Sequence, residues 1–114
     1  MSTDAGIKHD DGKLRYDLIP PRALEGLVKV LTFGANKYTS NGWKTVEKER
    51  YIAAAMRHFE AYRLGELNDP ESGLPHMYHV MCCITFISEL DMTKTKQKVI
   101  FNSKQLASSD EEQE

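Results

Sequence analysis

Histidines and acidic residues gather in one stretch of the chain, between Arg57 and His79. The residues concerned are His58, Glu60, Glu66, Asp69, Glu71, His76 and His79. Mixed imidazole and carboxylate ligands suit Zn, Mn, Co or Fe better than they suit Mg, whereas carboxylates alone suit Mg or Mn. We therefore predict a divalent-metal site drawn from His58, Asp69, His76 and His79, with Glu66 or Glu71 as a proton acceptor.

Helical spacing explains how these residues would meet. His76 and His79 are three positions apart at the start of an expected helix, so they share a face, and Cys83 lies one turn further along it. His58 lies late in the preceding expected helix. The loop between the two helices is short, so we expect them to pack antiparallel and to bring His58 close to His76.

Two other interpretations of the cluster remain open. Histidines three apart are often a packed, hydrogen-bonded pair, and an acidic loop is often only solvated. His76, His79 and Cys83 could also hold a structural zinc, although the spacing assigns no fourth ligand.

Basic side chains suited to phosphate are spread along the chain, and each could equally be an exposed solubilising group. The candidates are Lys13, Arg15, Lys37, Lys44 and Arg57. The segment Asp10–Lys13 is not a P-loop, because it lacks the first glycine and the following Ser or Thr. Trp43, the one tryptophan, is either a core anchor or a stacking platform for a base.

The elements that must position these residues are helices, so the predicted fold is all-α with about three principal helices. We expect the helices at about 21–33, 46–64 and 75–91. Gly34 and Gly65 would end the first two, and Thr45 would cap the second. The domain would then span residues 1–91, with a polar arm at 1–12 and a polar, partly disordered tail at 92–114. The apolar island Val99–Phe101 in that tail could be a packing strand or a partner contact.

Three short helices bury little surface, so oligomerisation is expected to complete the bundle. Apolar stripes are predicted on the first and third helices, at Leu24, Leu27, Val28 and Leu31 and at Met77, Val80, Met81, Ile84 and Ile87. The third helix is apolar on more than one side, because Cys82 and Phe86 lie outside that stripe. We expect a homodimer or homotetramer with Phe86 near the interface.

The bulk composition excludes several classes of protein. The net charge of −2 gives no sign of binding duplex nucleic acid or an anionic membrane. The two cysteines are adjacent and cannot pair with each other in regular structure, so a reducing compartment fits best. The polar N-terminal segment lacks a signal-peptide core, and we expect a cytoplasmic protein.

Several short segments, in order, resemble those of the phage dATP/dGTP diphosphohydrolase (MazZ-like) family, which is similar to the MazG-type all-α NTP pyrophosphatases. They are Lys8–Arg15, Asp17–Pro21, Phe33–Tyr38, Asn41–Lys44, Arg57–His58, Gly65–Glu66, Asp69–Gly73 and His76–His79 with Cys82. The resemblance implies hydrolysis of a purine dNTP to the monophosphate and pyrophosphate with a divalent metal (Mg, Mn or Co). The chain departs from the MazG pattern, because it has Glu66-Leu-Asn-Asp69 in a loop and no upstream Glu-Glu-x-x-Glu.

Two further functions stay open beside the enzyme. The same basic groups could serve a nucleotide-binding protein that sequesters its ligand without turnover, for which the His/acid cluster would be unnecessary. A small helical interaction protein that docks through the third helix is the other alternative, and nucleotides would not change its melting temperature.

Overall fold

The computed structural model describes residues 5–101, with side chains up to residue 93, and within that range it contains helices and no strand. The elements are the short 3-10 helices η1 (Tyr16–Leu18) and η2 (Gly42–Thr45) and the α-helices α1 (Pro21–Lys37), α2 (Lys48–Arg63) and α3 (His76–Phe101). The all-α prediction with three principal helices is confirmed. None of the described helices is long and apolar enough to cross a membrane.

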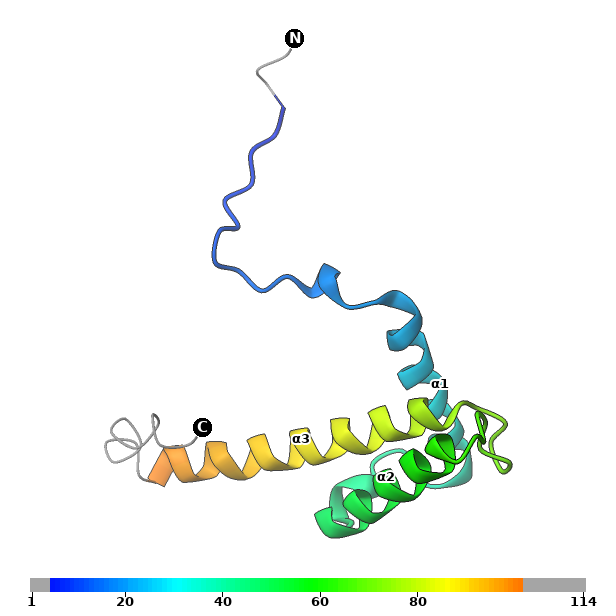
Figure 1. The fold of residues 1–114 in the computed structure, drawn as a ribbon. Coiled ribbons are helices and arrows are strands. Elements are labelled where there is room, and N and C mark those ends of the chain that lie inside the picture. The colour runs from blue at the N-terminus through cyan, green and yellow to red at the C-terminus, as the bar shows by residue number, and fades with distance from the viewer. Residues whose placement is uncertain (1–4, 102–114) are drawn as a thin grey trace.

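Helices α2 and α3 lie side by side and run antiparallel, as predicted (Figure 1). At the start of α2, Lys48 Nζ donates to Asp91 Oδ1 of α3 at 2.8 Å. Near the other end, His58 Nδ1 of α2 lies 2.8 Å from His76 Nδ1 at the start of α3. The first turn of α3 is therefore held against the last turns of α2.

Helix α1 packs against the first half of α3, and a glycine makes this approach possible (Figure 1). A Cβ atom built on Gly26 would lie 2.5 Å from the Tyr78 ring of α3, which is closer than any normal contact. Gly26 is itself buried. The absence of a side chain at this position is thus what lets α1 rest on the Tyr78 ring.

The described part of the chain has a small core. Its buried hydrophobic side chains are Val30, Cys82 and Cys83, and its buried polar side chain is His76. Two of the three apolar core side chains are thiols on one turn of α3. The fold therefore encloses the same end of α3 that carries the histidines.

The predicted inward stripes are confirmed only in part, because Leu27 and Leu31 of α1 are half-buried but other members of the stripes are exposed. Leu24 and Val28 are 46% and 49% exposed, and Ile84 is 54% exposed. Phe86 is half-buried, and its ring stacks on Trp43 of the same chain with centroids 4.4 Å apart, while the expected interface near it stays a prediction. Because α3 is apolar around much of its girth, periodicity alone could not select which side faces its own chain.

Several helix ends also differ from the predictions. Gly34 does not end α1, which continues to Lys37 and is capped by the Tyr38 N–H bonding to the Gly34 carbonyl. A lysine in the last turn suits the negative end of the helix dipole. Thr45 does not cap α2, because it belongs to η2 and the N-cap is Glu47. Gly65 does stop α2, with a φ of +106° that favours glycine.

Helix α3 is longer than predicted and runs past residue 91 to Phe101. Its added part is rich in lysine and contains a glutamine, both good helix formers. The island Val99–Phe101 thus belongs to a helix rather than a strand. The rest of the expected tail, 102–114, lies outside the described residues.

Candidate functional site

The acidic loop between α2 and α3 is held in shape by its own backbone. The Asp69 N–H donates to the Leu74 carbonyl and the Gly73 N–H to the Asp69 carbonyl, each at 2.8 Å. The His76 N–H donates to the Leu67 carbonyl at 2.9 Å. Gly73 has a φ of +74°, which allows this turn. The loop is an ordered support for its carboxylates rather than a merely solvated connection.

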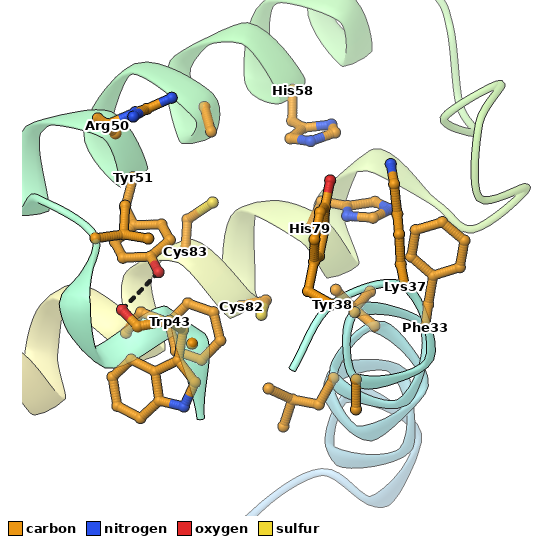
Figure 2. Close-up of a pocket in the computed structure, with 18 of the residues that line it drawn as sticks. Phe33, Lys37, Tyr38, Trp43, Arg50, Tyr51, His58, His79, Cys82 and Cys83 are labelled. Carbon is orange, nitrogen blue, oxygen red and sulfur yellow. Dashed lines mark hydrogen bonds between the residues drawn. The ribbon is translucent and has the colours of Figure 1, made fainter. Parts of the chain in front are cut away.

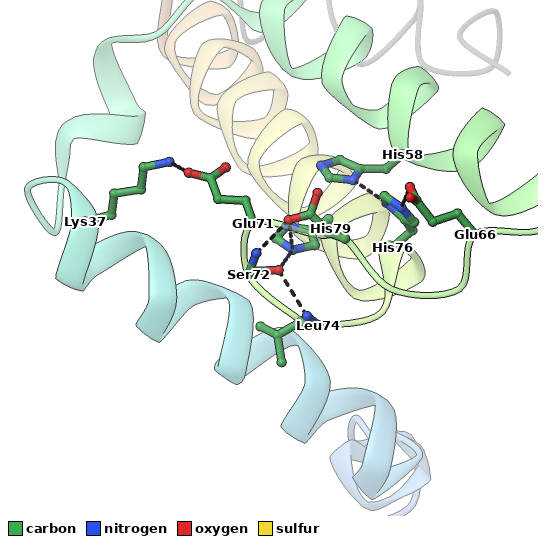
Figure 3. Close-up of polar contacts among 9 residues, drawn as sticks. Lys37, His58, Glu66, Glu71, Ser72, Leu74, His76 and His79 are labelled. Atoms are coloured by element: carbon green, nitrogen blue, oxygen red, sulfur yellow. Dashed lines mark hydrogen bonds and ion pairs between the residues drawn. The ribbon is translucent and has the colours of Figure 1, made fainter.

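Three of the predicted ligands converge. One ligand atom from each of His58, Asp69 and His76 can be chosen so that all lie within 4.8 Å of one another. His58 comes from α2, Asp69 from the loop and His76 from the first turn of α3. The α2–loop–α3 connection therefore forms a group of side chains that could hold a metal ion (Figure 3).

The buried His76 is bonded through both ring nitrogens. Its Nε2 lies 2.8 Å from Glu66 Oε1, and its Nδ1 lies 2.8 Å from His58 Nδ1. A carboxylate only accepts hydrogen bonds, so the Nε2 proton is donated to Glu66 and the Nδ1 lone pair faces His58. A ligating histidine usually has this arrangement, with the outer N–H held by a carboxylate and the inner nitrogen free for a metal.

His79 lies beside this group and supports it. Its ring stacks on His58 with centroids 4.5 Å apart and an interplanar angle of 8°. Its Nε2 lies 2.7 Å from Ser72 Oγ and 3.9 Å from Asp69 Oδ2. The geometry thus gives His79 a role in fixing the ring plane of His58, while its assignment as a ligand remains a prediction.

Burial and neighbouring groups favour neutral imidazoles and an ionised carboxylate at the site. Burial lowers the pKa of His58 and of His79, although Asp69 opposes this shift for both. Burial alone would raise the pKa of Asp69, but hydrogen bonds from the Ser72 N–H and hydroxyl, together with the two histidines, lower it overall. Neutral imidazoles beside an ionised carboxylate are the forms that bind metal.

The donor set fits a borderline transition metal. Two imidazoles and one carboxylate with room for water suit Zn, Mn, Co or Fe. The His58 and His76 Nδ1 atoms lie 2.8 Å apart, so both would be close enough to hold one metal ion in place of the hydrogen bond between them. The alternative zinc set with Cys83 does not form among the described residues.

A cavity of about 1050 Å³ opens beside the cluster, between α1, η2, α2 and α3. His58, Asp69, Glu71 and His79 line one end of it. Cys82 and Cys83 lie between its two side walls, one formed by Trp43 and Tyr51 and the other by Phe33, Lys37 and Tyr38 (Figure 2). A space of this size accommodates a nucleotide-sized ligand.

Two of the five predicted phosphate contacts lie at this cavity. Lys37 at the end of α1 forms an ion pair with Glu71 of the loop, and both side chains line the cavity. Arg57 also lines it, next to His58 on α2. Glu71 therefore remains a cavity residue, whereas Glu66, the other expected proton acceptor, is occupied with the outer side of His76.

The other three cations lie elsewhere in this chain. Lys13 belongs to the exposed arm before α1, and Arg15 forms an exposed ion pair with Asp17 at 2.8 Å (Figure 1). Lys44 lies 6.0 Å from the centre of the Trp43 ring and does not line the cavity. In a single chain these three side chains do not line the cavity, so their contact with phosphate stays a prediction.

Sequence reasoning missed three side chains of the site. Ser72 connects Asp69 to His79, and the Asp-x-x-Ser-Gly pattern of a capped turn could have indicated it. Arg50 and Ala54 lie on the cavity side of α2. Arg50 is eight and Ala54 four residues before His58, and this helical period would have identified them.

The fold and the site define a small all-α protein with a histidine–carboxylate group suited to a metal and an adjoining cavity with basic and aromatic walls. The family model described as "dATP/dGTP diphosphohydrolase, N-terminal" matches residues 3–99, and the chain belongs to this family. A protein of Salmonella phage PMBT28 named dATP/dGTP diphosphohydrolase is 37% identical over 82 residues. That match covers 72% of this chain and 28% of the relative's length. No solved structure matches the chain significantly.

Proposed function

We propose that the chain is a metal-dependent hydrolase that converts a purine deoxynucleoside triphosphate, dATP or dGTP, to the monophosphate and pyrophosphate. The observation that carries the proposal is the convergence of His58, Asp69 and His76 at one end of a cavity that Lys37 and Arg57 also line. The relative's name supports the substrate class. During phage infection this reaction would adjust the dNTP pool.

The chemistry divides between the metal and the chain's own residues. A divalent cation at the site would neutralise phosphate charge and lower the pKa of a coordinated water. Lys37 and Arg57 would hold the phosphates. Attack of the water oxygen on the α-phosphorus breaks the bond to the bridging oxygen, which leaves with pyrophosphate. The water's proton passes to a carboxylate, and Glu71 is better placed than Glu66 because it lines the cavity.

The first test is a product assay with purified protein, dGTP or dATP, and Mg, Mn or Co in turn. Release of pyrophosphate and monophosphate supports attack at the α-phosphorus, whereas inorganic triphosphate would mean a different hydrolase. His76→Ala and Asp69→Ala should abolish turnover, while Glu60→Ala, an exposed carboxylate on the same helix as His58, should retain it. Absence of nucleotide consumption with every metal refutes the enzyme.

A second function, nucleotide binding without turnover, is supported by the walls of the cavity. Lys37, Arg57 and the aromatic side chains that line it could hold a nucleotide without the histidine–carboxylate group. In that case His76→Ala with Asp69→Ala would leave nucleotide affinity unchanged, because the cavity walls rather than the metal ligands would supply it. Calorimetric titration of the double variant with dGTP separates the two functions.

A further inference from the structure

The cavity has two chemically different ends. The end near α3's first turn carries the imidazoles and carboxylates described above. The other end is formed by Trp43 and Tyr51, with Phe86 packed beside them, and the thiols of Cys82 and Cys83 lie between the walls (Figure 2). A triphosphate has nothing to gain at this second end, because burying its charge against apolar groups is costly. The uncharged part of a ligand is what fits there.

The aromatic end is rigid and well supported. Phe86 stacks on Trp43 and lies 5.1 Å from the Tyr51 ring. The Tyr51 hydroxyl donates to the Trp43 carbonyl at 2.7 Å, which ties η2 to α2. Tyr38 faces this wall from across the cavity (Figure 2). A flat heteroaromatic ring can lie between two such aromatic surfaces, and stacking of this kind tolerates any base.

The distance between the two ends matches a nucleotide. Arg50, Ala54 and His58 are spaced four residues apart on the cavity face of α2. Eight residues of α-helix span roughly 12 Å along the axis. This is comparable to the length of a nucleotide from its α-phosphorus to the far edge of a purine. A ligand with phosphate at His58 and Arg57 would therefore place its base at Arg50.

Arg50 has the chemistry to distinguish purines. Its side chain lines the cavity from α2, next to Tyr51, and forms no ion pair or side-chain hydrogen bond with the residues that the structure describes (Figure 2). The N–H groups of a guanidinium form a fork that matches the O6 and N7 acceptors of guanine. Adenine keeps the N7 acceptor but presents an N6 amino donor in place of O6, so one of the two hydrogen bonds is lost.

We propose that the aromatic end is the base subsite for the substrate of the proposed reaction, and that Arg50 is its specificity-determining residue, favouring guanine over adenine. The proposal rests on the proposed function for its choice of ligand, but base binding does not require turnover. The base lies between Tyr38 and the Trp43–Tyr51 wall, above the thiols, with its O6/N7 edge toward Arg50.

The test uses the monophosphates dGMP and dAMP in metal-free buffer, so that neither metal binding nor hydrolysis contributes. Trp43 is the only tryptophan of the chain, and its fluorescence reports on ligands at the aromatic end. We expect dGMP to change this fluorescence and to bind more tightly than dAMP. Arg50→Ala should weaken dGMP binding about tenfold to a hundredfold and make the two affinities similar.

Two further variants control for unrelated effects. Arg63→Ala removes a cation from the same helix that pairs with Glu60 and does not line the cavity, so it should leave both affinities unchanged. Ala54→Met fills the cavity between its ends and should weaken both monophosphates, whereas pyrophosphate binding at the other end should persist. Circular dichroism and melting temperature verify that each variant is folded.

The outcomes separate this proposal from the proposed function. Equal binding of dGMP and dAMP by the wild-type chain, or an unchanged preference in Arg50→Ala, overturns the base subsite even if dGTP is hydrolysed. Binding of dGMP measured by calorimetry without any change in Trp43 fluorescence overturns it as well. A guanine preference that depends on Arg50 supports the subsite even if no triphosphate is hydrolysed, in which case the enzyme proposal alone fails.

Discussion

Replacing Glu66 tests whether the buried histidine is a metal ligand. Glu66 holds the outer nitrogen of His76 at 2.8 Å and is 51% exposed, so its substitution removes little packing. Loss of such a carboxylate partner typically weakens metal affinity 10- to 100-fold. Because water can reach the half-exposed position and replace part of the hydrogen bond, we expect Glu66→Ala to be near the lower limit, about tenfold. This corresponds to about 1.4 kcal/mol.

Two further variants separate the hydrogen bond of Glu66 from its charge. In Glu66→Gln the amide oxygen can still accept the His76 N–H while the charge is lost, so the affinity should stay within about threefold of wild type. Glu60→Ala removes an equally exposed carboxylate that pairs with Arg63 of α2, and it controls for net charge. Calorimetric titrations with Mn, Co and Zn give the dissociation constant of each variant.

Two results would each refute the reasoning directly. If Glu66→Ala binds all three metals as tightly as wild type, then His76 does not bind through a nitrogen that Glu66 orients. If Glu60→Ala weakens binding by the same factor, the effect is one of overall charge and not of the hydrogen bond. Either result would contradict the assignment of Glu66 as a positioning residue.

Four further predictions follow from packing, burial and exposure. Gly26→Ala should lower the melting temperature because of the clash with α3, whereas Gly34→Ala, with no atom within 4 Å, should stabilise α1 by about 0.5–1 kcal/mol. Burial raises the pKa of Cys82 to about 12 from 9.0, so iodoacetamide should alkylate it about a thousandfold more slowly than a free thiol at pH 8. Burial lowers the pKa values of the stacked His58 and His79 below 6.5, so the unfolded chain binds more protons than the folded chain. The melting temperature of the metal-free protein should therefore fall as the pH drops below 6.5. The expected homo-oligomer should weaken in Ile84→Glu, because Ile84 is 54% exposed whereas Phe86 is partly covered by Trp43 of its own chain. Light scattering on wild type and variant measures the change, and a monomeric wild type would contradict the prediction.

The α2–loop–α3 unit was predictable because its signals are local. A helical stripe, a glycine stop at Gly65 and a short loop require an antiparallel pair, and the meeting of His58 with His76 follows from that pairing alone. The face of α3 that turns inward was not predictable, because its apolar residues surround the helix. Only the approach of η2, which places Trp43 on Phe86, decides that face. Contacts between distant elements leave no periodic signal in one sequence.

The roles within the cluster were harder to predict than its membership. Residue type alone made Glu66 and Glu71 equivalent as acids, but their partners differ. Glu66 faces the outer nitrogen of a buried ring, while Glu71 pairs with Lys37 across the cavity mouth. A carboxylate's function depends on which donor it meets, and loop geometry sets that choice over distances of a few ångströms.

The structure also explains how so small a core can support an ordered site. Few side chains are fully buried, so packing alone does not fix the ligands. Instead, hydrogen bonds close the loop, the His79 ring fixes the plane of His58, and Glu66 fixes His76. Each of these restraints acts between residues that are close in sequence or on two paired helices. The site therefore depends on the α2–α3 pair more than on α1, whose role is to supply Lys37 and one wall of the cavity.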